Sequence, residues 1–294
     1  MSLRALPKVQ ALQKPKGFDW DAPSSAFSHW ADLPHAAAED GGDASITIYD
    51  VIGEDPWSGG GFTARRMSAA LRAIGPKPVA VKINSPGGDV FEAIAIYNQL
   101  REHPAKVSVE VMGIAASAAS IIAMAGDHIA MGRGSMMMIH KAWGLVVGND
   151  DDFSAAAELF GTINNSMAEI YAARTGLKQE DVLAMLSGPT KASDGTWLTA
   201  SDAVDKKFAD ALIDEQPATD SANAAIATEV LARRRAEAAL ADKGVPRKER
   251  AAILNSLSGQ RDATRLAAPR DASGLAGDPR FAAEAAKLLA TLKR

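Results

Sequence analysis

Ser117 stands in surroundings that suit a nucleophile. It lies in the segment GIAASAAS, residues 113–120, which follows alternating valines that predict a strand over 107–111. We expect Gly113 to turn the chain into a helix of small residues, with Ser117 near the positive end of the helix dipole. Small neighbours let a substrate reach the hydroxyl, and the Ala118 N–H would lie beside a developing oxyanion. The same pattern is also typical of an ordinary N-cap serine.

His140 is the histidine best placed to act as a general base. It closes the apolar segment MMMI, residues 136–139, which predicts a core strand. A ring at the end of such a strand emerges at the edge of the sheet, within reach of a nucleophile. A partly exposed histidine without a catalytic role fits the same position. The other histidines lie in less suitable places, near the N-terminus, before a proline or in a turn: His29, His35, His103 and His128.

The segment NSPGGD, residues 84–89, predicts a tight turn directly after a strand over 79–83. Two adjacent glycines permit positive φ angles and a close approach of backbone N–H groups to a ligand. The Gly88 N–H can therefore supply half of an oxyanion hole. A plain turn after a strand explains the segment as well.

Asp194 is a candidate to orient a histidine. It lies in a loop before Thr199, which we expect to cap a helix, with Asp202 three residues on in a capping-box-like arrangement. An aspartate that only stabilises a turn is the alternative.

These residues belong to a chain in which predicted strands and helices alternate. Helices are expected over 63–74, 90–102 and 153–175, between strands that begin near residue 45. Residues 45–216 therefore predict an α/β domain with a largely parallel sheet. Residues 1–44 predict an irregular N-terminal arm, and residues 217–294 an Ala-rich, partly helical and flexible tail with 14 Lys and Arg against 9 Asp and Glu.

Composition excludes several classes of protein. The 294 residues contain no cysteine, so disulfides, Cys-ligated zinc, iron–sulfur clusters and a cysteine nucleophile are ruled out. The net charge of −4 disfavours nucleic acid as the main partner. We find no apolar segment of membrane-spanning length and no signal peptide, which favours a cytoplasmic protein. We expect no cofactor and no metal.

Taken in order, the segments resemble the Clp protease proteolytic subunit family over about residues 46–214. The similar motifs are SPGG at 85–88, GxAAS at 113–117, MIH at 138–140 and WLTAxxAV at 197–204. The doubled AASAAS, the following IAMAGD and the YAARTG at 171–176 are most similar to the phage and prophage branch, the Clp-like head maturation (prohead) proteases.

The resemblance implies a serine endopeptidase, either of the Clp type or independent of ATP. Ser117 would be the nucleophile and His140 the base, with the Gly88 and Ala118 N–H groups as oxyanion hole. In the family an acidic residue lies two positions before the aromatic residue of the last motif. Gly195 occupies that position and Asp194 lies one residue earlier, so a shifted triad, a dyad and another carboxylate all remain open.

The resemblance also implies a fold and partners. The fold would be the spiral of β-β-α units that Clp subunits share with crotonases, and the assembly a ring-shaped homo-oligomer with the helix over 153–174 between rings. Substrates would be proteins or peptides, among them capsid assembly proteins and the chain's own tail. Two other functions stay open: a crotonase-like acyl-CoA enzyme, and a catalytically inactive capsid scaffold.

Overall fold

The computed structural model describes residues 19–20, 23, 26–27, 44–54, 61–189, 195–213 and 228–257. Asp194, most of the N-terminal arm and the tail beyond residue 257 lie outside the described residues.

A mixed, mainly parallel sheet forms the centre of the protein. Five strands run parallel in the order β2-β3-β4-β5-β9. β6 pairs in parallel with the last residues of β4, and β8 pairs antiparallel with β6. The strands are β2 (Ala44–Ile48), β3 (Val79–Ser85), β4 (Val107–Ala116), β5 (His128–Met131), β6 (Met136–Ile139), β8 (Thr196–Thr199) and β9 (Ala211–Leu212). The predicted α/β class with a parallel sheet is confirmed.

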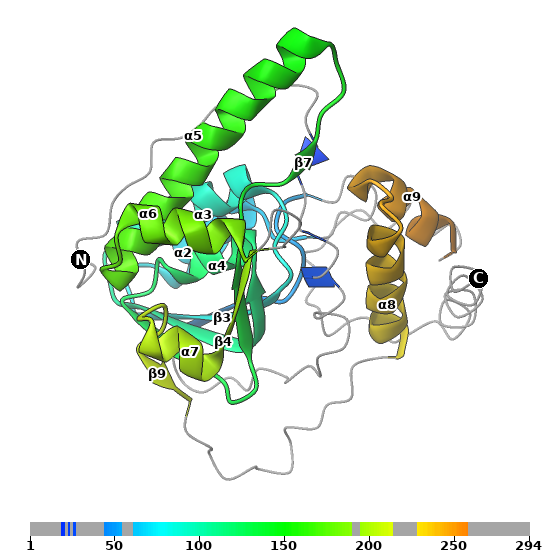
Figure 1. Ribbon diagram of the computed structural model, residues 1–294. Helices are drawn as coiled ribbons and strands as arrows, with labels where there is room; N and C mark the ends of the chain where they lie inside the picture. The colour runs from blue at the N-terminus through cyan, green and yellow to red at the C-terminus, as the bar shows by residue number, and fades with distance from the viewer. Residues whose placement is uncertain are drawn as a thin grey trace.

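Helices cover the sheet, and one of them projects away from it. The helices of this part of the chain are α2 (Ala64–Ile74), α3 (Val90–Glu102), α4 (Ala118–Ala123), α5 (Asp150–Thr175), α6 (Gln179–Ser187) and α7 (Ala200–Asp205). Figure 1 shows the first turns of α5, in green, extending well beyond the body of the protein. β7 (Gly144–Leu145) leads toward α5 and pairs with β1 (Asp19–Trp20). No described helix is both long and apolar enough to cross a membrane.

Capping residues fix where these helices begin and end. Thr63 accepts a hydrogen bond from the Arg66 N–H, and Thr199 forms a capping box with Asp202, as predicted. α5 begins at Asp150, three residues earlier than expected, because Asn149 caps it.

Gly113 does not turn the chain, which corrects the sequence-based prediction. β4 continues to Ala116, and the turn comes at Ser117. A Cβ atom at Gly113 would lie 2.8 Å from Asn84 Oδ1, so glycine is needed here for the close packing of β4 on β3. The Ile114 N–H donates to the same Asn84 oxygen at 3.3 Å.

The C-terminal tail contains two helices that pack on the domain, α8 (Thr228–Asp242) and α9 (Arg247–Leu257). Small and aliphatic side chains on them are buried: Ala236, Ala238, Leu240, Ala251 and Leu254. The predicted partly helical tail is confirmed for these residues, and the flexibility of the tail stays a prediction. Alanines that cannot build a core of their own still let the two helices approach an existing surface closely.

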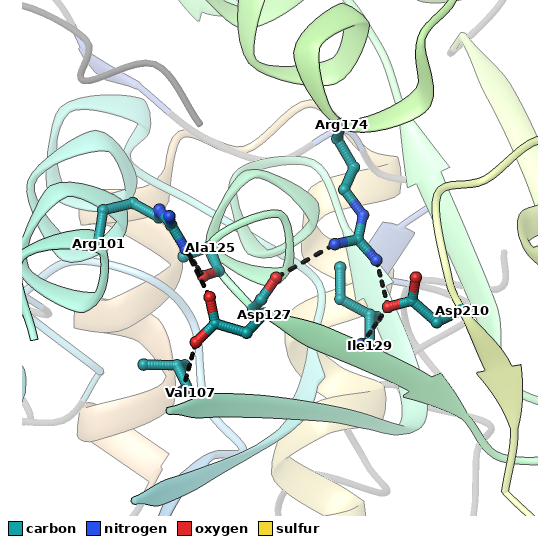
Figure 2. Close-up of polar contacts among 8 residues, drawn as sticks. Arg101, Val107, Ala125, Asp127, Ile129, Arg174 and Asp210 are labelled. Atoms are coloured by element: carbon teal, nitrogen blue, oxygen red, sulfur yellow. Dashed lines mark hydrogen bonds and ion pairs between the residues drawn. The ribbon is translucent and has the colours of Figure 1, made fainter. Parts of the chain in front are cut away.

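A buried ionic network ties α3 and α5 to the sheet (Figure 2). The Arg101 guanidinium lies 3.3 Å from Asp127 Oδ1, while Asp127 Oδ2 accepts from the Val107 N–H at 2.9 Å. On the other side, the Arg174 side chain of α5 donates to Asp210, whose Oδ2 also accepts from the Ile129 N–H. The network fixes the C-terminal end of α5, the part of this helix that borders the candidate site, against β5 and the start of β9.

Candidate active site

Three parallel strands end at the same edge of the sheet, and each is followed by a predicted site residue. β3 ends at Ser85, β4 at Ala116 and β6 at Ile139. The carboxyl ends of parallel strands are where α/β proteins place their sites. The pairing of Ala116 with Met138 sets Ser117 beside His140.

Ser117 adopts a strained backbone conformation at the junction of β4 and α4. Its φ of 53° and ψ of −127° lie in a region that non-glycine residues rarely occupy, at a cost of about 1–3 kcal/mol. Its N–H donates to the Met138 carbonyl at 2.9 Å, and its side chain makes no capping hydrogen bond to α4. The observed contacts therefore disfavour the N-cap interpretation and match a nucleophile elbow.

His140 points at the Ser117 hydroxyl. Its Nε2 lies 2.7 Å from Ser117 Oγ, within the range expected for a nucleophile and its base. The residues after it are anchored, since the Lys141 N–H donates to the Leu186 carbonyl and the Ala142 N–H to Asn164 Oδ1. With the proton on Nδ1, the imidazole Nε2 can accept the hydroxyl proton of Ser117.

The turn after β3 is pressed against this pair. Gly87 has a φ of +98°, and a Cβ atom there would lie 2.6 Å from Ser117 Cβ and 2.9 Å from the Ala118 nitrogen. The Ser85 hydroxyl braces the turn, because it donates to the Asp50 carbonyl at 2.6 Å and accepts from the Gly87 N–H. Only glycine fits at position 87, both for its φ and for the available space.

Gly88 and Ala118 line the same pocket as Ser117 and His140. Ala118 is the first residue of α4, where an N–H has no partner within the helix. The bridge between Gly88 and Ile52 uses the Gly87 carbonyl and the Asp89 N–H, so it does not engage the Gly88 N–H. Two backbone donors beside a serine hydroxyl can together bind an oxyanion.

Gly87→Ala tests this close packing. The added methyl group must displace the turn from Ser117 and Ala118, so we expect kcat/KM for a peptide to fall by roughly 10²–10³, the usual cost of losing one oxyanion donor. Gly161→Ala is the matched control, because Gly161 lies in α5, where an added Cβ atom would meet nothing within 4 Å beyond the backbone of its own helix. The control should keep full activity. Wild-type kinetics in Gly87→Ala would show that the turn need not contact the elbow.

The third position of the site is constrained by Gly195. This residue is buried with a φ of +87°, and a Cβ atom there would lie 2.6 Å from His140 Cβ and 2.1 Å from the Ile139 carbonyl oxygen. A side chain at 195 therefore cannot be accommodated. Asp202 is engaged elsewhere, because Thr199 donates to its carboxylate from both backbone and hydroxyl, which lowers the pKa of Asp202. Asp194 adjoins Gly195 but lies outside the described residues.

Sequence reasoning missed a buried hydroxyl pair behind the elbow. The Ser120 hydroxyl donates to the Ser117 carbonyl at 2.6 Å and lies 2.8 Å from the Tyr171 hydroxyl. Burial raises the pKa of Tyr171 above its usual range, so this phenol stays a proton donor. The i, i+3 spacing of Ser117 and Ser120 was a signal of the first contact, and Tyr171 begins the YAARTG motif, but no local pattern indicated that this tyrosine contacts Ser120.

The rest of the pocket is apolar. Its lining includes Val90, Ile121, Ala142, Met167 and the half-exposed Trp143. Among the residues that the structure describes, no three His, Asp or Glu side chains are grouped to hold a metal ion.

The α/β fold thus brings a serine and a histidine together at the distance expected of a nucleophile and its base. The family model "Clp protease" matches residues 64–216. Among curated relatives, ATP-dependent Clp protease proteolytic subunit 3 of Rhodococcus jostii is 32% identical over 148 residues, 49% of this chain and 69% of the relative. Subunit 1 of Corynebacterium jeikeium is 33% identical over 141 residues, 47% of this chain and 71% of the relative.

The chain therefore belongs to the Clp protease family. Its match to subunit 1 of Mycobacterium leprae, at 31% identity, covers 66% of that relative's length. A solved ClpP1 variant from Listeria monocytogenes is 20% identical, with a TM-score of 0.47 over 59% of this chain and 92% of that one.

Proposed function

We propose that this protein is a serine endopeptidase that cleaves peptide bonds through an acyl-enzyme. The observation that carries the proposal is the 2.7 Å contact between Ser117 Oγ and His140 Nε2 at a strained elbow. Neither an acyl-CoA enzyme of the crotonase type nor an inactive scaffold needs such a pair, so the contact favours a peptidase over both.

The proposed mechanism uses four groups of the chain. His140 accepts the Ser117 proton as Ser117 Oγ attacks the peptide carbonyl carbon. The Gly88 and Ala118 N–H groups stabilise the oxyanion, and His140 then protonates the leaving amine. Water, deprotonated by His140, releases the acyl group from Ser117. No cofactor or metal enters this scheme.

A substrate comparison tests the reaction class. The purified protein should hydrolyse a short peptide or an unfolded protein and leave an acyl-CoA thioester intact. Thioester hydrolysis without any peptidase activity would replace the proposal with the crotonase-like alternative, and inactivity on both would favour the scaffold.

We further propose that the natural substrates are capsid assembly proteins of a phage or prophage, which the protein processes in the bacterial cytoplasm. We also propose that the protein acts as a ring-shaped homo-oligomer. The sequence motifs over 115–127 and 171–176 support the phage role. Exposed apolar side chains on and beside β7 and at the start of α5 support contact with another copy: Trp143, Leu145, Val147 and Phe153. Co-expression with a capsid assembly protein should shorten that protein without an ATPase, and unaltered capsid protein would refute this role.

Asp194→Asn tests the third member of the site. If the carboxylate orients His140, kcat should fall by roughly 10²–10⁴, because an amide favours the wrong imidazole tautomer. Asp202→Asn is the matched control and should leave kcat nearly unchanged, since Asp202 caps α7. Near wild-type kinetics in Asp194→Asn would make the site a dyad or assign the role to another carboxylate.

A further inference from the structure

The two tail helices contact the catalytic domain through arginine side chains that donate to backbone carbonyls. Arg247, the first residue of α9, donates from Nη1 to the Ile52 carbonyl at 3.0 Å and from Nη2 to the Gly53 carbonyl at 3.4 Å. Arg234 of α8, which is 4% exposed, donates to the Tyr49 carbonyl at 3.1 Å. Figure 1 shows α8 and α9, in orange, side by side at the flank of the domain. The two helices form a hairpin, the α8–α9 hairpin, and its arginines donate hydrogen bonds to three backbone carbonyl groups of segment 49–53.

Segment 49–53 is itself hydrogen-bonded to the turn after β3, which carries Gly88. The Ile52 N–H donates to the Gly87 carbonyl at 2.8 Å, and the Ile52 carbonyl accepts from the Asp89 N–H at 3.0 Å. A Cβ atom at Gly88 would lie 2.2 Å from that carbonyl oxygen, so the two segments are in direct contact. The Ile52 carbonyl therefore receives two donors, one from the turn and one from Arg247.

The other side of the turn has its own support. The Asp89 carboxylate accepts from the Phe91 and Glu92 N–H groups and caps α3, which anchors the turn from the helix side. Segment 49–53 is paired with Phe62, whose N–H donates to the Val51 carbonyl and whose carbonyl accepts from the Gly53 N–H, both at 2.8 Å. From the tail, α8 and α9 add the arginine contacts to the carbonyls of residues 49, 52 and 53. The family model covers neither segment 49–53 nor the hairpin.

We propose that the α8–α9 hairpin positions the turn Gly87–Asp89, which carries the Gly88 N–H of the proposed oxyanion hole. Arg247 is the positioning residue. The inference rests on the proposed peptidase function. Arg247 touches no reacting atom and acts through Ile52 on the Gly87–Asp89 turn, and so on the direction of the Gly88 N–H. A guanidinium suits this role because its planar donors can engage two adjacent carbonyls in one fixed orientation, and its charge strengthens both hydrogen bonds. The tail then contributes to catalysis.

The test compares Arg247→Ala, Arg247→Lys and a matched control, Arg235→Ala, in the full-length protein. Arg235 is exposed on α8, so its removal takes away the same charge without the carbonyl contacts. We expect Arg247→Ala to lower kcat for a peptide about tenfold with KM unchanged, less than the loss of a whole oxyanion donor. Labelling of Ser117 by a fluorophosphonate, whose phosphoryl oxygen occupies the oxyanion position, should slow in parallel. Arg247→Lys should recover part of kcat and part of the labelling rate, because an ammonium group reaches only one of the two carbonyls.

Hydrogen exchange separates this inference from the proposed function. In Arg247→Ala the amides of residues 87–91 should exchange faster, whereas those of β5 should keep their wild-type rates. This readout needs no activity, so it decides the inference even if the wild type proves inactive, a result that would overturn the peptidase proposal alone. Unchanged exchange at 87–91, or a loss of kcat fully explained by a smaller folded fraction, would overturn the positioning role. If Arg247→Ala does not fold, Arg247→Lys carries the same measurements.

Discussion

Ser117→Ala is expected to abolish peptide hydrolysis, with kcat reduced on the order of 10⁶-fold, the typical cost of removing a serine nucleophile. The hydroxyl is the group that forms the acyl bond, and its loss leaves His140 without a partner at 2.7 Å. The fold should be retained, because alanine at position 117 removes only an oxygen at the rim of the pocket. Steady-state kinetics on a chromogenic peptide, with circular dichroism as a check of folding, measure the effect.

Ser120→Ala is the matched control for this prediction. Ser120 lies one helical turn away and donates to the Ser117 carbonyl, so its hydroxyl braces the elbow and does not face the substrate. We expect this variant to keep most of its activity. Equal residual activity in the two variants would show that Ser117 is not the nucleophile.

His140→Ala is expected to be comparably inactive, and the wild-type activity should depend on pH as a histidine base requires. The base must be neutral to accept a proton, so kcat/KM should be low in acid and rise with pH through one ionisation. The activity is therefore present above this ionisation and lost below it. A pH profile from 5 to 9 on a peptide substrate measures this dependence.

His128→Ala serves as the control for the histidine assignment. His128 lies at the start of β5, where its Nδ1 is 3.6 Å from Asp210, and it takes no part in the pocket of Ser117. This variant should retain both activity and pH profile. A flat profile in the wild type, with chemistry rate-limiting, would count against a histidine base.

The sequence indicated which residues belong to the candidate site, but not how they lie relative to one another. Ser117 and His140 could be identified because each follows an apolar strand, and strand ends are readable from residue type and periodicity. The 2.7 Å contact between them depends on the register of β4 against β6, which pairs Ala116 with Met138, and no local pattern encodes that register. The antiparallel pairing of β8 with β6, which brings Gly195 against His140, could not be predicted from the sequence either.

The errors in the prediction also have physical causes. Gly113 suggested a turn because glycine often supplies positive φ, yet here it permits close packing against Asn84. The contacts of the tail with the domain were also missed: its alanines cannot form a core of their own, yet α8 and α9 contact the domain through side chains such as that of Arg247, which donates to the Ile52 carbonyl. Both features depend on partners far away in the chain, about 30 residues in the first case and nearly 200 in the second.

Covalent labelling followed by mass spectrometry tests the central claim most directly. The purified protein is treated with a fluorophosphonate and digested, and the modified residue is identified in the wild type, Ser117→Ala and His140→Ala. The Ser117–His140 geometry predicts one adduct, on Ser117, with loss of peptidase activity in proportion to labelling and no adduct at this site in either variant within the same time. Peptide hydrolysis that persists after Ser117 is fully labelled, or an adduct on another residue that accounts for the inhibition, would contradict it.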